Sequence, residues 1–258
     1  MAGTHKKRNT ILTIFEVLFA LIFLFAVFQA GKILYSYHEG DDFYEESQNT
    51  YLTDTGSGTS QKDLRLGFSV DLKALQAVNP DVKGWIYIPD SAVSYPLLWS
   101  NSDDTYLRTT YTGEHSVFGS IFFSHLSSPD LTDKHTLIYG HNTKNGSMFG
   151  GLKQYKEQTY YESHPYIYLI MKGRTYKYQV KSAFTAETTD DVYVLTYPDE
   201  ATFQAWYADI LTRSEIDTGT TIMRGNEKVL TLSTCTSRTK TERFTVNAVL
   251  TDAWANTF

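Results

Sequence analysis

A single cysteine and two arginines lie close together near the C-terminus of this 258-residue chain. The stretch TLSTCTSRTKTERFTV, residues 231–246, holds Cys235, Arg238 and Arg243. A thiolate is a strong nucleophile, and a guanidinium can bind a carbonyl or the oxyanion that forms when a nucleophile attacks it. The stretch therefore indicates a cysteine that acts as a nucleophile. The simpler alternative is a buried cysteine that acts as a small apolar residue.

Strand alternation indicates which arginine accompanies the thiol. The runs KVLTLSTC and RFTVNAVL read as two strands, with Leu232 and Phe244 on their apolar faces and Cys235 and Arg243 on the opposite faces. If both apolar faces cover one core, the thiol and this guanidinium emerge together on the surface away from that core. Arg238 lies in the connecting loop, where alternation gives no information. We therefore expect Arg243 to be the functional arginine.

A thiol nucleophile also needs a partner that favours the thiolate or transfers protons, most often a histidine. The chain has seven histidines. We prefer His141, because it ends an apolar strand in TLIYGHNTKNG at the point where a glycine lets the backbone turn into a loop. His125 and His164 are the alternatives.

The first thirty residues predict a membrane anchor. Lys6, Lys7 and Arg8 precede the apolar stretch 11–30, in which Glu16 is the one charged residue. As a helix this stretch is about 30 Å long, which matches the hydrocarbon core of a bilayer. The basic cluster predicts a cytoplasmic N-terminus and an extracellular remainder. A cleaved signal peptide is the alternative, although the apolar stretch exceeds the usual length of such a segment.

Composition divides the chain further and excludes several function classes. An acidic net charge of −6 argues against a nucleic-acid partner. The sequence lacks a glycine-rich phosphate loop, C-x-x-C and H-E-x-x-H, so we expect no cofactor and no metal. An exported domain usually pairs its cysteines in disulfides, whereas this chain has a single cysteine and cannot form an internal disulfide. The predicted parts are a cytoplasmic N-terminus (1–10), a transmembrane signal-anchor (11–30), a polar extracellular tether (31–65) and a folded domain (66–258).

The folded domain reads as mainly β with added helices. Ser69 is the expected cap of a short helix, and a longer helix is expected over 198–213. Turn-rich segments separate the strand-like runs, which favours a barrel or a sandwich. The predicted strands cover residues 85–89, 93–98, 117–123, 135–140, 166–170, 174–184, 227–235 and 243–251.

The combined motifs resemble the sortases, cysteine transpeptidases of Gram-positive cell surfaces. The resemblance rests on TLSTC, on an arginine in the next strand and on IYGHN about ninety residues earlier. The stretches NPDVKGWIYIPDSAVSYPLL and YGHNTKNGSMFGGL are similar to the class B branch. The resemblance runs from about residue 68 to residue 251. The predicted tether lacks a DPW- or DPF-like lid motif, which disfavours a class C pilin polymerase.

The resemblance implies an eight-stranded sortase-type β-barrel, preceded here by the N-terminal transmembrane helix. It assigns His141, Cys235 and Arg243 as the catalytic residues. Ser233 and Thr234 are the implied substrate-binding residues. One departure lies in SNSDDTYL, where relatives have an Asp-Asn pair before the Tyr-Leu and this chain has Asp103 at the Asn position. A role inherited from that asparagine is therefore not transferred.

The resemblance also implies a reaction and its partners. The Cys235 thiolate attacks the threonine carbonyl of a P-x-T-type sorting motif near the C-terminus of a secreted protein. An amine of a peptidoglycan cross-bridge, or a lysine of another surface protein, then receives the acyl group. The expected location is the cell membrane, with a single span and the catalytic domain outside. A secreted cysteine peptidase and a non-catalytic adhesion or scaffold domain are the alternatives.

Overall fold

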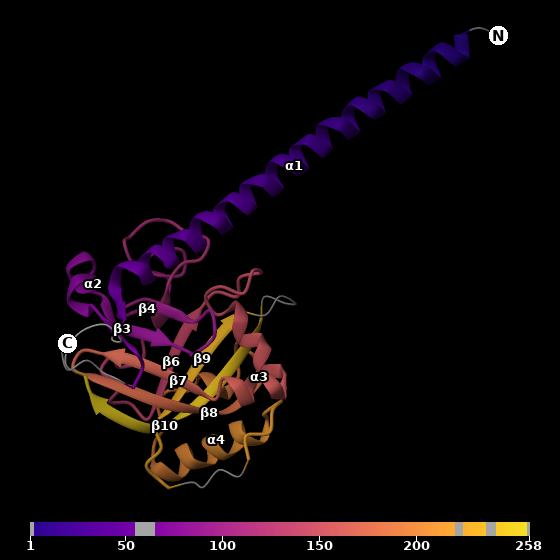
Figure 1. The fold of residues 1–258 in the computed structure, drawn as a ribbon. Helices are drawn as coiled ribbons and strands as arrows, with labels where there is room; N and C mark the ends of the chain where they lie inside the picture. Colours follow the sequence, from indigo (N-terminus) through magenta and orange to yellow (C-terminus); the bar gives the residue numbers. More distant parts are fainter. Residues whose placement is uncertain (1–2, 55–64, 220–223, 236–240, 257–258) are drawn as a thin grey trace.

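The computed structural model describes residues 3–54, 65–219, 224–235 and 241–256, without the side chains of residues 3–11 and Cys235. Within these residues the centre of the fold is a closed barrel of eight strands, in the order β10-β8-β7-β3-β4-β5-β6-β9 (Figure 1). The predicted mainly β fold is confirmed, and each predicted strand run corresponds to one barrel strand. The strands are β3 (Val82–Tyr87), β4 (Ser94–Leu98), β5 (Ile121–Phe123), β6 (His135–Gly140), β7 (Tyr166–Met171), β8 (Arg174–Glu187), β9 (Val229–Cys235) and β10 (Glu242–Ala255).

The barrel interior is apolar and closed to solvent. Leu232 of β9 and Phe244 and Val246 of β10 are fully buried in the main core, together with Trp85 and Ile138. These positions in β9 and β10 are the alternate ones that the sequence predicts to be apolar, so the predicted strand faces are confirmed. Each such side chain stabilises the fold by roughly 1.5–3 kcal/mol relative to an exposed one.

A second apolar layer covers the outside of the barrel. It is formed by α4 (Glu200–Thr212) and the short 3-10 helix η2 (Asp191–Tyr193), which lie between β8 and β9 in the sequence. Phe203 and Trp206 of α4 belong to a separate buried cluster that includes Phe184 of β8. In Figure 1 this helix runs below β8 and β10. The helix predicted over 198–213 is thus confirmed, and its apolar face packs on the barrel wall.

The second layer changes the surroundings of the polar faces of β9 and β10. Thr231, Ser233 and Asn247 are buried, so the prediction that these faces emerge on the surface is wrong over most of their length. Buried polar groups require hydrogen-bond partners. Thr231 Oγ1 donates to Asn247 Oδ1 (2.7 Å), and Asn247 Nδ2 donates to Ser182 Oγ (3.0 Å). The polar faces therefore form a hydrogen-bonded seam between the barrel and its outer layer.

His135, the first residue of β6, belongs to this seam and is fully buried. Its Nδ1 donates to the carbonyl oxygen of Val194 (2.7 Å), and its Nε2 lies 2.8 Å from Thr231 Oγ1. The Trp206 ring lies against the imidazole, with 4.4 Å between centroids. Burial lowers the pKa of His135 to about 4, although the hydrogen bond to Val194 opposes this change. The ring is therefore neutral at pH 7.

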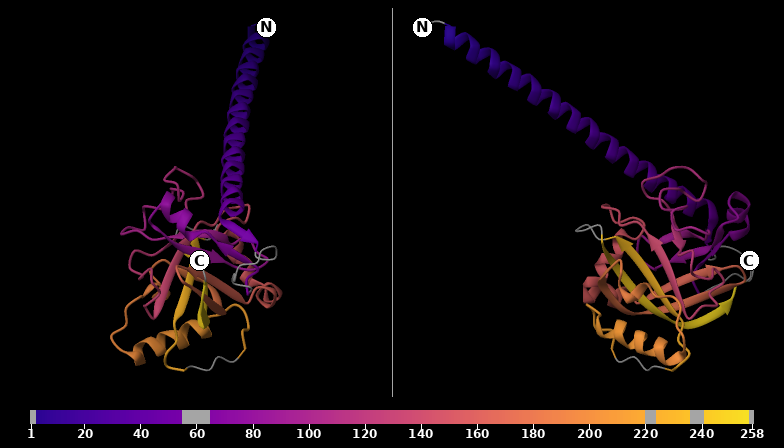
Figure 2. Two further views of the ribbon diagram at one scale, coloured as in Figure 1. Left: turned by 60° about the vertical axis from the view of Figure 1, so that its left-hand side comes forward. Right: turned by 180° about the vertical axis from the view of Figure 1, so that it is seen from behind.

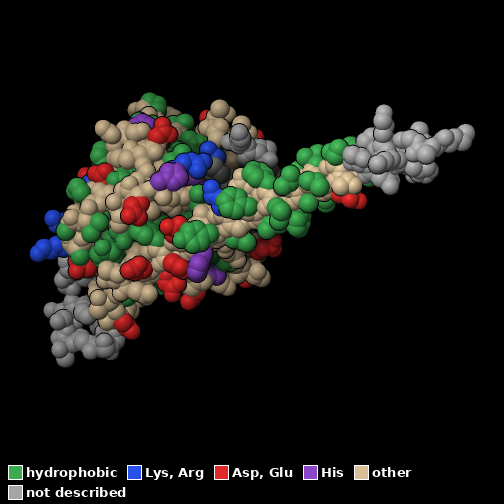
Figure 3. Space-filling view, turned by 90° about the horizontal axis from the view of Figure 1, so that it is seen from above, with side chains coloured by type: hydrophobic (Ala, Val, Ile, Leu, Met, Phe, Trp, Pro, Cys, Tyr) green, Lys and Arg blue, Asp and Glu red, His purple; other side chains and the backbone are tan. Residues whose placement is uncertain are grey.

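The N-terminal helix is long and only partly in contact with the barrel. The single helix α1 (Gly3–Tyr51) comprises 49 residues, and its first half projects away from the domain (Figures 1 and 2). Hydrophobic side chains cover the projecting part (Figure 3). The large hydrophobic side chains from Leu12 to Leu34 are all at least half exposed. By length and composition this helix is a candidate membrane span.

The predicted tether is more structured than expected in the part of it that the structure describes. Residues 31–51 continue α1, and the chain then forms β1 (Leu52–Asp54), which pairs antiparallel with β2 (Phe68–Val70). Tyr44 is buried against the domain. The polar composition of this segment reflects its solvent face, while aromatic residues on the opposite face contact the barrel. The domain boundaries drawn at residues 30 and 65 remain predictions.

The short helices near the barrel show one further difference from prediction. The helix α2 (Leu72–Val78) is capped by Asp71, whose carboxylate accepts a hydrogen bond from the Ala74 amide (2.8 Å). Ser69 lies within β2, so its prediction as the cap is wrong. Asp is as good a cap as Ser because either oxygen can accept from the first turn. Two short helices follow the loop after β6: η1 (Gly150–Lys156) and α3 (Gln158–Ser163).

Burial of His135 predicts a stability that depends on pH. The unfolded chain protonates this histidine near pH 6.5, whereas the folded chain does so only near pH 4. Between these values the unfolded state holds more protons, so stability falls as the pH is lowered, by up to about 3 kcal/mol. Urea unfolding in detergent from pH 7 to pH 4 should show a smaller loss for His135→Gln than for the wild type. Equal losses of stability in the two proteins would contradict the assignment of this pH dependence to His135.

Candidate active site

Two strand pairings bring the three predicted catalytic positions together at one end of the barrel. β6 and β9 run parallel with Gly140 opposite Thr234, so His141 follows β6 at the end where Cys235 completes β9. β10 begins at the same end, and Arg243 pairs with Cys235 across the antiparallel β9–β10 ladder. The backbone therefore places His141 and Arg243 on either side of the cysteine position.

The cysteine and the competing arginine are described to different extents. The backbone of Cys235 is the last position of β9, but its side chain lies outside the described residues. Arg238 lies entirely outside them. The preference for Arg243 therefore stays a prediction, supported by its fixed strand position opposite the cysteine.

A cavity of about 340 Å³ lies beside these positions. Four of the five predicted site residues line it: His141, Ser233, Thr234 and Arg243. Residues that the sequence analysis did not single out also line it, among them Asp104, Leu107, Tyr139, Thr188 and Tyr193. Of these, Tyr139 carries a local signal, because it lies two residues before His141 on β6 and so shares its face. The others come from loops and, for Tyr193, from the end of η2, and their approach to the cavity depends on the closed barrel.

His141 is held in one tautomer by the backbone of a neighbouring loop. Its Nε2 lies 2.5 Å from the carbonyl oxygen of Leu107. A carbonyl can only accept, so Nε2 carries the proton and Nδ1 is the nitrogen that can exchange a proton with a reacting group. Burial lowers the pKa of His141; the Leu107 hydrogen bond opposes this change, while the charges of Arg108 and Arg243 add to it. The imidazole is consequently neutral for the most part at pH 7.

The two predicted substrate-binding residues differ in how their hydroxyls are satisfied. Ser233 is buried, and its Oγ lies 3.1 Å from the hydroxyl of Tyr193. Thr234 is 1% exposed, yet its Oγ1 makes no hydrogen bond within the described part of the chain. An unpaired buried hydroxyl is costly, and this one lines the cavity. Thr234 is therefore suited to bind a polar group of a ligand, and Ser233 is held through Tyr193.

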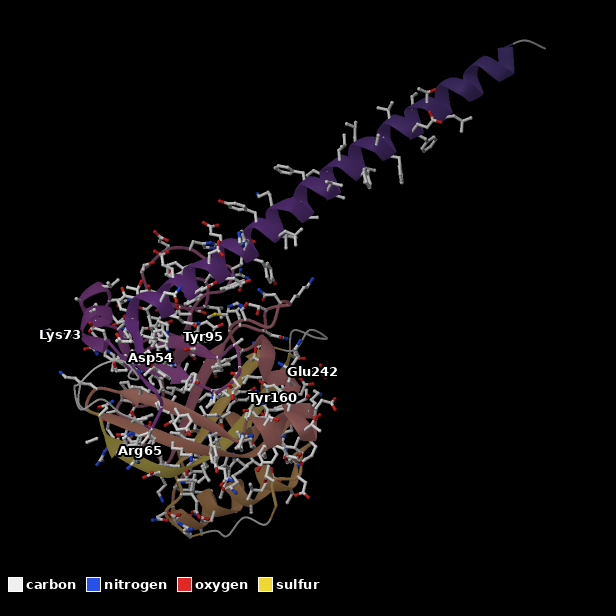
Figure 4. All side chains as sticks on the ribbon, viewed as in Figure 1. Asp54, Arg65, Lys73, Tyr95, Tyr160 and Glu242 are labelled. Atoms are coloured by element: carbon white, nitrogen blue, oxygen red, sulfur yellow. The ribbon has the colours of Figure 1, made fainter. Side chains whose placement is uncertain are left out.

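The alternative histidines lie outside the cavity lining and have other contacts. The backbone amide of His125 donates to Asp103 (2.6 Å), and its ring nitrogen Nδ1 lies 3.2 Å from the same carboxylate. Nε2 of His164 lies 3.1 Å from the carbonyl oxygen of Asp90, and its Nδ1 lies 2.9 Å from that of Tyr160. The His164 ring also stacks on the ring of Tyr160, which is labelled in Figure 4. These contacts give His125 and His164 structural roles that do not involve the cavity. Asp103 itself lines the cavity and is already hydrogen-bonded.

Comparison with known proteins agrees with this geometry. The profile of the Sortase domain matches residues 86–251. Sortase B of Listeria monocytogenes serovar 1/2a (strain ATCC BAA-679 / EGD-e) is 31% identical over 216 residues, which cover 83% of this chain and 85% of that protein.

Solved structures show the same fold. Sortase B from B. anthracis in complex with AAEK1 has a TM-score of 0.72 and 28% identity, covering 85% of this chain and 99% of that one. The Staphylococcus aureus sortase B–substrate complex has a TM-score of 0.66 and 27% identity, covering 70% and 84%. The family match and the curated relatives define the chain as a cysteine transpeptidase. The chain belongs to the sortase family, and its curated relatives are sortase B enzymes.

The charge of Arg243 predicts a measurable effect on His141. The ring should titrate below the ordinary histidine pKa of about 6.5. Arg243→Gln should raise that midpoint, because it removes a positive charge that disfavours the imidazolium. Titration of ¹⁵N-labelled histidine by NMR measures both values. Arg174→Gln, an exposed change at the start of β8, serves as the control and should leave the midpoint unchanged. A wild-type midpoint at or above 6.5 would contradict the lowered pKa of this half-buried ring.

Proposed function

We propose that the chain is a membrane-anchored transpeptidase that cleaves a C-terminal sorting motif after threonine. In the first step the Cys235 thiol gives its proton to Nδ1 of His141, the thiolate sulfur bonds to the threonine carbonyl carbon, and the carbonyl oxygen becomes an oxyanion beside Arg243. The C–N bond then breaks, and His141 gives a proton to the departing amine. The product is a thioester between Cys235 and the N-terminal part of the secreted protein.

In the second step an amine opens the thioester. The amine nitrogen bonds to the carbonyl carbon, His141 takes up its proton, and the C–S bond breaks to return the cysteine. The acceptor is an amine of a peptidoglycan cross-bridge or a lysine of another surface protein. Preference for an amine over water distinguishes this transferase from the alternative of a secreted cysteine peptidase.

One observation carries the proposal: the pairing of Arg243 with Cys235, next to the parallel pairing of Gly140 with Thr234. These pairings support a common cavity for His141, Arg243 and the cysteine. Family membership supports the same reaction class. A scaffold role would not require a histidine in a fixed tautomer at the wall of this cavity.

The protonation states imply that only a minority of molecules is reactive at any moment. An unperturbed thiol has a pKa of about 8.5 and is mostly protonated at pH 7. The pKa of His141 is lowered by burial, so the imidazolium is scarce at the same pH. The form that holds a thiolate and an imidazolium together is therefore sparsely populated before substrate binds.

Ser233 and Thr234 are proposed to bind the substrate close to the attacked carbonyl. The unpaired Thr234 hydroxyl supports direct contact with the peptide backbone. Ser233 is proposed to act with Tyr193, its hydrogen-bond partner, at the cavity wall.

The proposed location follows from α1. Its apolar stretch 11–30 is proposed to span the cell membrane, with Lys6, Lys7 and Arg8 on the cytoplasmic side and the catalytic domain, residues 66–258, outside. This arrangement brings the cavity to the side of the membrane where secreted substrates arrive.

Peptide transfer tests the proposed reaction. The full chain in detergent should convert peptides with P-x-T-type motifs into amide products when a glycine peptide or a lysine derivative is supplied. Cys235→Ala should abolish both cleavage and transfer, because no thioester can form. Mass spectrometry of the products distinguishes transfer from hydrolysis. A wild type that only hydrolyses every peptide, whatever amine is present, would refute the transferase assignment.

Removal of each arginine tests which one binds the oxyanion. Arg243→Ala should slow acylation by about 10²–10³-fold, the usual effect of losing one such donor. Arg238→Ala should leave acylation nearly unchanged. The rate is measured from release of the C-terminal peptide fragment in a single turnover. The reverse result, with Arg238 required and Arg243 dispensable, would overturn the assignment.

A further inference from the structure

The second half of α1 is docked on the barrel through one face of the helix. Gly40, Tyr44 and Ser47 are buried, at the spacing of three and four residues that places side chains on one helix face. A side chain at Gly40 would overlap the Phe118 ring, whose atoms lie 2.8 Å from the Cβ position. The Tyr44 ring packs edge-on against Tyr95, which lies beneath this part of α1 (Figure 4).

Asp41 connects this docked face to the loop that begins at His141. Asn145 Nδ2 donates to Asp41 Oδ2 (2.6 Å), and Ser147 Oγ donates to Asp41 Oδ1 (2.5 Å). Both carboxylate oxygens are thus used by the same loop. The helix that carries the candidate membrane span therefore contacts the loop of the candidate catalytic histidine.

The loop itself is tied closely to His141. The amide of Phe149 donates to the carbonyl oxygen of His141 (3.0 Å), which closes the loop on its first residue. The amide of Met148 donates to the hydroxyl of Tyr95 (2.9 Å), the ring on which Tyr44 packs. A displacement of the loop by α1 would consequently move the backbone of His141.

A second route connects α1 to the ring of His141. The hydroxyl of Tyr44 donates to the carbonyl oxygen of Gly119. Gly119 in turn lies against Leu107, since a Cβ at this glycine would be 2.4 Å from the Leu107 carbonyl oxygen. That carbonyl is the acceptor for Nε2 of His141. Segments that touch α1 therefore hold both the backbone and the ring of the histidine.

We propose that the docked half of α1 positions His141 for proton transfer, with Asp41 and Tyr44 as positioning residues. This inference rests on the proposed function, in which His141 exchanges protons with the substrate amines. Neither residue lines the cavity beside the histidine, so each acts through the loop or the carbonyl that it contacts. The helix that carries the membrane anchor would then also hold the catalytic histidine in position.

The test compares Asp41→Ala and Tyr44→Phe with Asp42→Ala in the full chain in detergent. Asp42 is a matched control, because it is exposed and its carboxylate pairs with His38 on the same helix (3.3 Å). Asp41→Ala and Tyr44→Phe should lower kcat about threefold to tenfold, within the range expected when a catalytic group is slightly misplaced. KM for the sorting peptide should remain within about twofold, because the lining of the cavity is intact. Asp42→Ala should behave as the wild type.

A double-variant background separates positioning from a general loss of stability. In Asn145→Ala/Ser147→Ala the partners of Asp41 are absent, so Asp41→Ala should have little additional effect on kcat. If Asp41→Ala lowers kcat as much in this background as in the wild type, or no more than Asp42→Ala does, the inference is wrong. A rise in KM with unchanged kcat would likewise contradict a role in positioning the histidine.

Hydrogen exchange provides a readout that does not depend on activity. Amides of residues 141–149 should exchange faster in Asp41→Ala than in Asp42→Ala, because the loop loses its attachment to α1. If the wild type transfers no peptide to any amine, the proposed function fails. The exchange result is independent of that failure. Equal exchange in the two variants would show that Asp41 does not hold the loop.

Discussion

Closure of the barrel through β9 is the constraint on which the candidate site depends. β9 pairs parallel with β6 on one side and antiparallel with β10 on the other, and these ladders end at the same edge. A slip of one residue in either ladder would move Cys235 to the opposite face or remove Arg243 from its side. The core residues Leu232 and Phe244 prevent such a slip, because it would move them out of the apolar core and into the buried polar seam. The chemistry is thus positioned by the same packing that stabilises the fold.

The outer layer formed by α4 makes that edge rigid in a different way. It buries the polar faces of β9 and β10 and obliges their side chains to hydrogen-bond to one another. His135 and Ser233 lie within this buried layer, one at each end of the β6–β9 pairing. Because satisfied buried polar groups have few alternative arrangements, the layer fixes the strands as well as covering them.

The sequence predicts most of the scaffold and less of its surroundings. Alternation identifies the core residues Leu232 and Phe244 and the shared face of Cys235 and Arg243, because both depend on local periodicity, whereas the direct pairing of these two residues is seen only in the structure. It cannot reveal that Thr231 and Asn247 are buried, since a polar strand face under a helix has the composition of an exposed one. The polar composition of the segment after residue 30 predicts a tether for the same reason. Leu107 reaches the cavity from a loop and Tyr193 from the end of η2, and tertiary contacts set the position of both.

The unbroken course of α1 has a consequence for the reach of the enzyme. If residues 11–30 span the bilayer as proposed, the eleven residues 31–41 form a rigid spacer of at most about 17 Å. The loop of His141 is fixed at that height, since Asp41 contacts it directly. A substrate still held in the same membrane must extend its chain across this gap, which takes about five residues at roughly 3.4 Å each. Under the proposed membrane arrangement, the length of this helix would set the shortest distance between a cleavage motif and the membrane at which the motif could reach the cavity.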